Sequence, residues 1–302
     1  MSVLRIKSSV KHIDPLPQAR HADNVTNAPS DTLVLAGTGK TGSRLATKLA
    51  KLGLGVRTAA RSGADVHFDW DDATTHLAAL QGIGRLYLVA PVMRTDFADQ
   101  VATFLDLAEA AGVRHVTYLS AYGIDAAPPQ VALRAVELDL IGRGGITHAI
   151  LRPAWFMQNF SDTFLKPVDG VITVPTADGA EAFIDAEDIA AVAAETLANP
   201  DAHAGAGYAL TGAEAITVRE AAEIIANVAG KPLRHNDIDR DVWIRDSVAA
   251  GVPAEYGEML RMLTETIASG LGSRPNDTVQ QVTGAPPITF ADFARRTARA
   301  WT

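Results

Sequence analysis

The sequence predicts an α/β protein: a doubly wound parallel sheet of the Rossmann type, followed by a smaller α+β lobe. From residue 32 to residue 151, short apolar runs of buried-strand type alternate with helical periodicity, as in a parallel sheet with crossover helices. A G-x-G-x-x-G pattern, formed by Gly37, Gly39 and Gly42, stands between the first apolar run and the first helical stretch. After residue 160 the alternation breaks, so we expect the second lobe to begin there.

The predicted strands of the first half are apolar runs that end in small or polar residues, at 32–36, 55–60, 66–68, 86–89, 113–119 and 146–151. The predicted helices repeat apolar residues at spacings of three and four, at 41–52, in a short stretch that ends near Leu80, at 97–108 and at 129–142. Gly53 is expected to end the first helix. Ligands of such sheets bind beyond the carboxyl ends of the strands, so the residues there are the functional candidates.

In the second half, the spacing of apolar residues predicts two short strands, at 171–174 and 182–184. It also predicts several helices, at 189–197, 218–228, 239–249, 254–269 and 289–300. Thr289 is the expected N-cap of the last helix. We therefore divide the chain into a dinucleotide-binding domain at 31–159 and a smaller substrate-side lobe at 160–302 that is partly woven into the first. Residues 1–30 are expected to form a mobile extension or a strap that packs on the domain.

Composition narrows the functional classes. The chain has 302 residues, a net charge of −8 and no long basic run, which argues against a nucleic-acid partner. It contains no cysteine, its histidines lack metal-ligand spacing, and no apolar run approaches the length of a membrane span. Residues 1–30 carry no apolar segment of the secretory kind. We expect a cytoplasmic protein with a small-molecule substrate, no membrane partner and no metal; the oligomeric state stays open.

The glycine turn is predicted to bind the pyrophosphate of a dinucleotide. It consists of Gly37, Thr38, Gly39, Lys40, Thr41 and Gly42. Gly37 permits the tight turn out of the strand, Gly39 leaves room for the pyrophosphate, and Gly42 lets the helix pack closely on the strand. The helix N-terminus offers unpaired N–H groups to the phosphates. Val34 stands where a nucleoside-triphosphate P-loop needs a glycine, which argues against that alternative.

The end of the second strand indicates which dinucleotide is bound. NAD sites place an acidic residue there for the ribose 2′-hydroxyl, whereas NADP sites place cationic groups for the 2′-phosphate. Here the strand ends in Arg61 and Ser62 without an acid, and Lys40 is a candidate for a second cation. We therefore expect NADP(H) to be preferred over NAD(H). Asp69, after the third strand, is expected either to accept a hydrogen bond from the adenine amino group or to cap a turn.

The remaining candidates for cofactor contacts follow the third to sixth strands: Trp70, Ala90, Pro91, Ser120 and Pro153. Their shared position beyond the carboxyl ends of the strands is the reason for the assignment.

Several stretches together resemble a known family. G-T-G-K-T-G-S-R, H-F-D-W-D-D-A-T, L-V-A-P, L-R-P-A-W-F-M-Q-N-F and F-I-D-A-E-D-I-A occur in this order, and the chain ends with F-A-D-F and a tryptophan. They resemble the NmrA-like branch of the atypical short-chain dehydrogenases, most of all its ergot-alkaloid biosynthesis group of festuclavine dehydrogenase type. The resemblance spans residues 32–302. It implies a Rossmann domain, NADP(H) and a substrate cleft between two lobes; the branch also includes quinone reductases and nucleotide-sensing regulators.

The usual catalytic pair of short-chain dehydrogenases, Tyr-x-x-x-Lys, does not occur in this sequence. The resemblance implies a lysine just before the helix that precedes L-R-P, because many NmrA-like proteins keep one there. Counting back from Leu151-Arg152-Pro153, this position falls on Leu133, with Arg134 beside it. Ser120 and Tyr122 follow the fifth strand and are the catalytic candidates; Tyr122 alone, with an ordinary pKa of ~10, is a weak acid. Hydride transfer to an iminium carbon avoids the difficulty, because the acceptor is already cationic and needs no proton.

The substrate-binding candidates follow Pro153: Trp155, Phe156, Met157 and Asn159, together with Tyr122. Aromatic faces suit a cationic ring system, methionine adapts its shape, and the asparagine is expected to orient a ligand or cap a turn. The sequence thus predicts an NADP(H)-dependent reductase of imines, iminium ions or similar conjugated molecules. A non-catalytic NADP-sensing regulator and a quinone or enone reductase are the alternatives.

Overall fold

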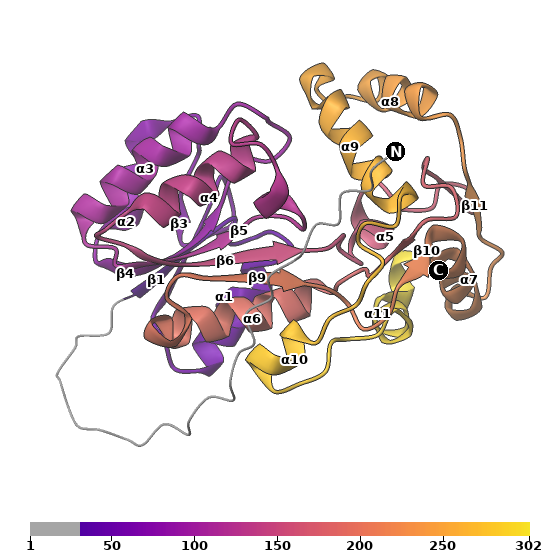
Figure 1. Cartoon of the computed structure of the whole chain (residues 1–302). Coiled ribbons are helices and arrows are strands. Elements are labelled where there is room, and N and C mark those ends of the chain that lie inside the picture. Colours follow the sequence, from indigo (N-terminus) through magenta and orange to yellow (C-terminus); the bar gives the residue numbers. More distant parts are fainter. Residues whose placement is uncertain (1–30) are drawn as a thin grey trace, which may run out of the picture.

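The computed structural model describes residues 31–302 and consists of two lobes (Figure 1). The prediction for residues 1–30, a mobile extension or a strap, lies outside the described residues. The larger lobe is built on a seven-stranded sheet in the order β3-β2-β1-β4-β5-β6-β9. All its strand pairs are parallel. The sheet strands are β1 (Asp31–Leu35), β2 (Val56–Ala60), β3 (Val66–His67), β4 (Ile83–Val89), β5 (His115–Leu119), β6 (Thr147–Pro153) and β9 (Ala206–Leu210).

Helices cover both faces of this sheet. One face carries α2 (His76–Leu80), α3 (Ala98–Ala111) and α4 (Ala132–Gly142), and the other carries α1 (Gly42–Lys51), α6 (Ala186–Ala198) and α10 (Thr278–Thr283). Strand β1 shows why the apolar run is continuous: Leu33 and Leu35 pack in the core of the first face, whereas Val34 packs in the core of the second. Side chains of a strand alternate between faces, so a strand that is covered on both sides is apolar at every position.

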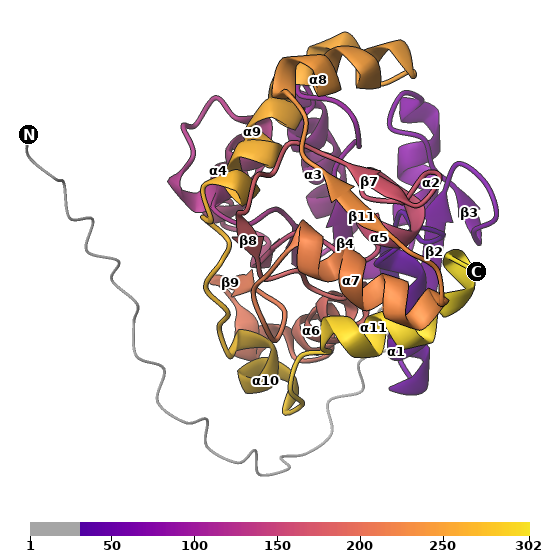
Figure 2. The same cartoon turned by 90° about the vertical axis from the view of Figure 1, so that its right-hand side faces the viewer.

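The smaller lobe packs around α7 (Val218–Ala229) and α11 (Phe290–Thr297). Its other elements are α5 (Asn159–Asp162), β7 (Val171–Thr173), β8 (Ala180–Glu181), β10 (Ile216–Thr217), β11 (Arg234–Asn236), α8 (Arg240–Ala249) and α9 (Gly257–Ala268). A capping box between Thr217 and Glu220 starts α7, and Thr289 caps α11 by accepting a hydrogen bond from Asp292 N. Figure 2 shows α7 and α11 lying side by side.

The sequence prediction differs from the structure in the second half. Strand β9 joins the central sheet beside β6, although no strand was predicted at 206–210. This strand lies at the edge of the sheet and contains small residues, so it lacks a buried apolar run. The strand predicted at 182–184 is absent from the described residues: β8 ends at Glu181, and only Ile184 forms an isolated bridge, with Phe156. That run is apolar because it is buried.

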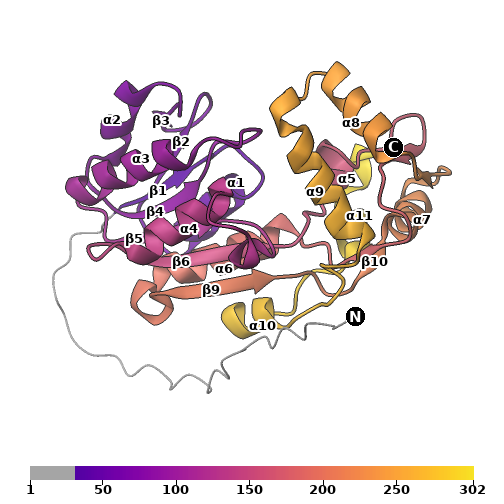
Figure 3. The ribbon, with the colours of Figure 1, turned by 45° about the horizontal axis from the view of Figure 1, so that its top comes forward.

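Residues beyond 160 return to the sheet twice. Helix α6 packs on β4, β5 and β6, and β9 extends the sheet beyond β6. The chain therefore crosses between the lobes several times, which places α9 of the smaller lobe opposite α4 of the larger one (Figure 3). No helix within residues 31–302 is long and apolar enough to cross a membrane.

Candidate functional site

A cavity of about 320 Å³ lies at the carboxyl ends of β1, β2 and β4, beside the segment that follows β3. Of the residues predicted for cofactor binding, eight line it: Thr38, Gly39, Arg61, Ser62, Asp69, Trp70, Ala90 and Pro91. Gly37, Lys40, Thr41, Gly42, Ser120 and Pro153 do not belong to its lining. Four consecutive strand ends contribute to one hollow, the position at which doubly wound sheets bind nucleotides.

The three glycines of the turn differ in what surrounds them. A Cβ on Gly42 would lie 2.2 Å from the Ala36 carbonyl oxygen, so this glycine permits helix α1 to approach the end of β1. A Cβ on Gly37 would lie 2.6 Å from Thr58 Cβ, so Gly37 serves the packing of β1 on β2. A Cβ on Gly39 would lie 3.1 Å from the Ala36 oxygen, a tight contact, and Gly39 lines the cavity. Of the three glycines, Gly39 is therefore the one that borders the cavity.

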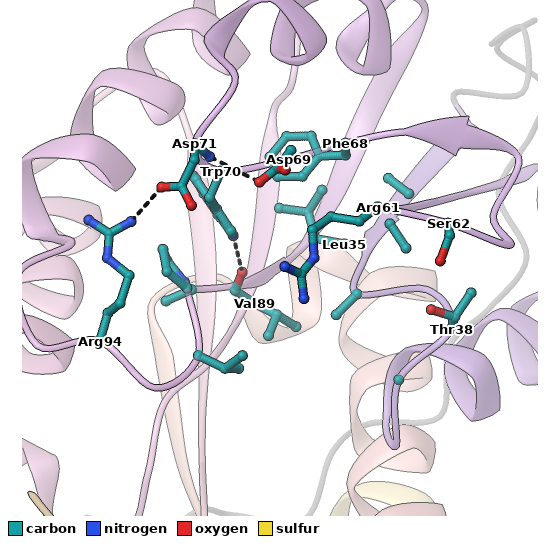
Figure 4. A pocket seen from close by; sticks show the side chains of 17 residues that line it. Leu35, Thr38, Arg61, Ser62, Phe68, Asp69, Trp70, Asp71, Val89 and Arg94 are labelled. Atoms are coloured by element: carbon teal, nitrogen blue, oxygen red, sulfur yellow. Dashed lines mark hydrogen bonds and ion pairs between the residues drawn. The ribbon is translucent and has the colours of Figure 1, made fainter. Parts of the chain in front are cut away.

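Arg61 extends into this cavity from the end of β2, between Val89 on one side and Thr38 and Ser62 on the other (Figure 4). The Arg61 side chain makes no hydrogen bond or ion pair within residues 31–302, so its guanidinium is available to a ligand. Asp65 follows β2, but its carboxylate accepts hydrogen bonds from the Thr58 N–H and hydroxyl groups, both at 2.8 Å, and it does not line the cavity. Arg61, and not Asp65, therefore lines the cavity at the end of β2.

The segment after β3 forms the opposite wall. Asp69 Oδ1 accepts a hydrogen bond from Asp71 N at 3.1 Å, which is the turn-capping role, and its second oxygen has no such bond. Trp70 donates from Nε1 to the Val89 carbonyl at 3.3 Å and contacts Phe68 and Phe104 edge-to-face. Trp70 thus holds the loop after β3 against the end of β4.

Lys40 points toward the smaller lobe. Its ammonium donates to Asn159 Oδ1 at 3.2 Å and to the Thr163 hydroxyl at 3.1 Å. Burial lowers the pKa of this ammonium, and the nearby Asp162 carboxylate partly offsets that shift. The structure therefore brings together one residue predicted for the cofactor and one predicted for the substrate, in a contact that joins the glycine turn to α5.

Ser120 belongs to a buried charge network that the sequence analysis missed. Its hydroxyl donates to Glu137 Oε1 at 2.6 Å, and the Glu137 carboxylate also accepts two hydrogen bonds from Arg152, at 2.8 and 2.9 Å. Arg134 donates to Glu137 Oε2 at 2.7 Å. Burial raises the pKa of Glu137, but the bonds from Arg152 and Ser120 outweigh burial and hold the pKa below its ordinary value. The Ser120 proton is therefore directed at Glu137.

The aromatic candidates after Pro153 do not form one group. Met157 is 1% exposed and packs in the core of the smaller lobe, with Phe160 and Phe183. Trp155 packs against that same core, whereas Phe156 packs against the core beneath α6. None of the three lines the cavity at the carboxyl ends of β1, β2 and β4. Burial raises the pKa of Tyr122, and the negative charges of Glu181 and Asp125 raise it further.

Glu181 is a second buried carboxyl that sequence reasoning missed. It is 2% exposed, its Oε1 accepts from Trp155 N at 3.4 Å, and its Oε2 has no partner within residues 31–302. Burial raises the pKa of this carboxyl from an ordinary 4.5 to about 7, and the Trp155 N–H partly opposes the shift. A strand of two residues carries no periodicity that would have marked this acid as buried.

Glu181 should make the stability of the protein fall as the pH rises. Between pH 4.5 and about 7 the folded state keeps a proton that the unfolded chain releases, so stability that is full below pH 4.5 is lost as the pH rises through about 7. The loss from this group is about 3 kcal/mol. We expect Glu181→Gln, which stays neutral, to remove this part of the slope. Urea denaturation of both proteins across this range measures it; parallel slopes would contradict the assignment.

The comparison with known proteins agrees with this architecture. The model of the NmrA-like family matches residues 29–270, which is more than half of the chain. The chain belongs to the NmrA-like family. It is 37% identical over 279 residues to YesF of Bacillus subtilis (strain 168), an uncharacterised oxidoreductase, covering 89% of this chain and 96% of that protein. It is 30% identical over 286 residues to agroclavine dehydrogenase of Claviceps fusiformis, covering 89% and 98%.

Among solved structures, the NmrA-like chain is similar to the NADPH-dependent quinone oxidoreductase QOR2 of Escherichia coli in complex with NADPH. The TM-score is 0.71, and the match covers 88% of this chain and 99% of the other at 22% identity. At this identity the match shows a shared fold. The family resemblance inferred from the motifs and the Rossmann-type sheet are thus both confirmed.

Residues of the motifs that carry the family resemblance make hydrogen bonds that stabilise the fold of this NmrA-like protein. Gln158 donates to Asp185 Oδ1 at 2.9 Å and accepts from Ala186 N at 2.9 Å, which ties the segment after β6 to the start of α6. Trp301 near the end of the chain donates to the Phe160 carbonyl at 2.8 Å. The Gln158 contacts join the segment after β6 to α6, whereas the Trp301 contact lies within the core of the smaller lobe.

Proposed function

We propose that this protein is an NADP(H)-dependent reductase that transfers hydride to an imine, an iminium ion or a similar conjugated small molecule. The coarser statement, an NAD(P)H-dependent oxidoreductase, rests on family membership and on relatives named as oxidoreductases and dehydrogenases. The observation that carries the choice of cofactor is Arg61, unpaired among the described residues and extended into the cavity at the strand ends. The substrate proposal rests on the absence of a Tyr-x-x-x-Lys pair from the sequence.

The residues of the cavity fit a dinucleotide. Gly39 leaves the edge of the glycine turn open for the pyrophosphate, and Arg61 with Ser62 would hold a 2′-phosphate. The nicotinamide of the bound cofactor supplies the hydride. Ser120 offers its lone pairs and not its proton to a ligand, because Glu137 accepts that proton. Tyr122 stays protonated at neutral pH and, with its raised pKa, is a weak acid.

This arrangement favours acceptors that need no proton in the hydride step. A carbonyl acceptor develops an alkoxide that requires an acid, whereas an iminium carbon becomes a neutral amine when it takes the hydride. Leu133 occupies the place where the family resemblance implies lysine, and it packs against the core beneath α4. A leucine cannot polarise a carbonyl, so orientation of the acceptor must provide most of the rate.

Arg61 should determine the choice between the two nicotinamide cofactors. We expect the wild type to bind NADPH more tightly than NADH by about 1.5–3 kcal/mol, the contribution of a charged hydrogen bond to a phosphate. Arg61→Ala should remove most of this difference and leave NADH binding nearly unchanged. Calorimetric titration with both cofactors measures it. Arg57→Ala is the matched control, because Arg57 contacts the carbonyls of Ala79 and Gln81 outside the cavity.

A substrate panel tests the proposed reaction. We expect NADPH oxidation with preformed cyclic iminium ions and at most slow oxidation with simple ketones. Trp155→Ala should lower turnover if its ring stacks on the cation, whereas Leu133→Lys should not improve iminium reduction. Efficient ketone reduction that depends on Tyr122 would refute the proton-free mechanism. Tight NADPH binding without turnover of iminium, enone, quinone or ketone substrates would instead support a nucleotide-sensing protein.

A further inference from the structure

The loop at residues 61–65, between β2 and β3, carries Arg61 into the cavity at the strand ends and is short for the connection that it makes. The two strands are parallel neighbours, and Val66 pairs with Ala59, so the chain passes the end of β2 and returns alongside it within this loop. Connections between parallel strands ordinarily take about a dozen or more residues. The backbone groups of so tight a turn need hydrogen-bond partners close by.

Asp65 and Thr58 provide these partners through a reciprocal set of hydrogen bonds. The Asp65 carboxylate accepts from the Thr58 backbone N–H and from the Thr58 hydroxyl, both at 2.8 Å. The Thr58 hydroxyl in turn accepts from the Asp65 backbone N–H at 3.0 Å. The bonds from Thr58 lower the pKa of the Asp65 carboxyl, so it stays ionised at neutral pH. The last residue of the loop is therefore fastened to the middle of β2.

The first two residues of the loop, Arg61 and Ser62, line the cavity, whereas Asp65 does not (Figure 4). The backbone at Arg61 has its own contact, because His67 Nδ1 on β3 lies 3.0 Å from the Arg61 carbonyl oxygen. Both ends of the loop are thus fixed, one by His67 and the other by Thr58. The side chains of Arg61 and Ser62 therefore extend from a backbone whose position is set before any ligand binds.

We propose that Asp65 is a positioning residue for NADP(H) selectivity: by fastening the loop to Thr58, it holds Arg61 and Ser62 where they bind the 2′-phosphate. The inference rests on the proposed function for the cofactor and goes beyond it by giving a favourable role to an acid. By its charge alone, a carboxylate beside a phosphate site repels the phosphate and lowers NADPH affinity. Fastening has the opposite sign, because a loop that is ordered beforehand loses less conformational entropy on binding. The sign of the effect therefore separates the two roles.

The test is the affinity of the full-length protein for NADPH and for NADH, measured by calorimetric titration without substrate. Asp65→Ala removes the acceptor, and Thr58→Val removes the hydroxyl but keeps the volume of the side chain. We expect each variant to bind NADPH about 10-fold more weakly and NADH less than about 2-fold more weakly, since NADH lacks the phosphate. Asp65→Asn keeps an acceptor oxygen and Thr58→Ser keeps a hydroxyl, so both should retain most of the NADPH affinity.

A double variant shows whether Asp65 acts through Arg61. In an Arg61→Ala background, Asp65→Ala should lower NADPH affinity little further, because the guanidinium that the loop positions is already absent. Asp292→Ala is the matched control: Asp292 makes the same reciprocal pair with Thr289 at the start of α11 and does not line the cavity. It should leave both affinities unchanged.

Stronger NADPH binding in both Asp65→Ala and Asp65→Asn would mean that the acid acts by its charge, and would overturn the proposal. Equal weakening of NADPH and NADH binding, or a full additional loss in the Arg61→Ala background, would also overturn it, since either result places the effect outside the 2′-phosphate contacts. If Arg61→Ala removes the NADPH preference and Asp65→Ala does not, this inference fails and the proposed cofactor stands. Equal affinities of the wild type for the two cofactors would refute both together.

Discussion

Gly39→Val is expected to abolish measurable NADPH binding while the protein stays folded. The branched side chain would fill the open edge of the glycine turn, where the pyrophosphate meets the backbone, and would remove two or more hydrogen bonds to charged oxygens. Each such bond contributes about 1.5–3 kcal/mol, so affinity should fall at least ~100-fold. Calorimetric titration with NADPH measures the loss, and thermal unfolding of the unliganded protein shows whether the fold survives.

Gly42→Ala separates this effect from damage to the fold. Its new Cβ would lie 2.2 Å from the Ala36 carbonyl oxygen, which is backbone and cannot move aside without displacing α1 or the end of β1. We expect a loss of about 3 kcal/mol in the free energy of unfolding. At Gly39 the nearest atom would lie 3.1 Å away, so a smaller loss is expected there. Undiminished NADPH affinity in Gly39→Val would remove this turn from the binding site.

Glu137→Ala should be among the most destabilising single substitutions in the larger lobe. The Glu137 side chain is fully buried and joins Ser120 on the loop after β5, Arg152 on β6 and Arg134 on its own helix. Removing it leaves the Arg152 guanidinium, which is only 12% exposed, without its carboxylate. Removal of one partner from a buried ion pair costs about 3–5 kcal/mol, because the remaining charge is desolvated and unpaired. Urea denaturation with two independent probes measures this loss.

Arg134→Ala is the matched comparison for the Glu137 network. Arg134 makes one hydrogen bond to Glu137 and is more exposed than Arg152, so its loss should cost about 1 kcal/mol and leave the bidentate pair intact. A cost as large as that of Glu137→Ala would mean that the two arginines do not share Glu137 as the geometry indicates. Gly207 supports the geometry, because a Cβ there would lie 2.6 Å from the Arg152 guanidinium.

The structure shows the surroundings of Ser120 and Tyr122, the two predicted catalytic residues. The Ser120 hydroxyl donates a hydrogen bond to Glu137. The backbone N–H of Tyr122 donates to the Pro153 carbonyl oxygen at 3.0 Å. The assignment of Ser120 and Tyr122 to catalysis stays a prediction.

The sequence by itself determined the approximate positions of the first six strands along the chain, the glycine turn and the place of Arg61 after the second strand. These are local features: a strand covered on both faces must be apolar at every position, and close backbone approach at Gly42 excludes any side chain. A few consecutive residues of the sequence are therefore enough to predict each of these features. The helix start at Thr289 is local for the same reason, since an N-cap side chain binds a backbone N–H three residues later.

Only the tertiary structure decided which distant residues meet. Strand β9 pairs with β6 across more than fifty positions of sequence, and its small residues gave no apolar run. Lys40 donates a hydrogen bond to Asn159, 119 positions away, and Glu137 has partners from two other elements. A cavity lined by Leu133 of α4 and by Met259 and Met262 of α9 forms because these two helices face each other. Such contacts depend on the packing free energy of the whole chain, which no local propensity encodes.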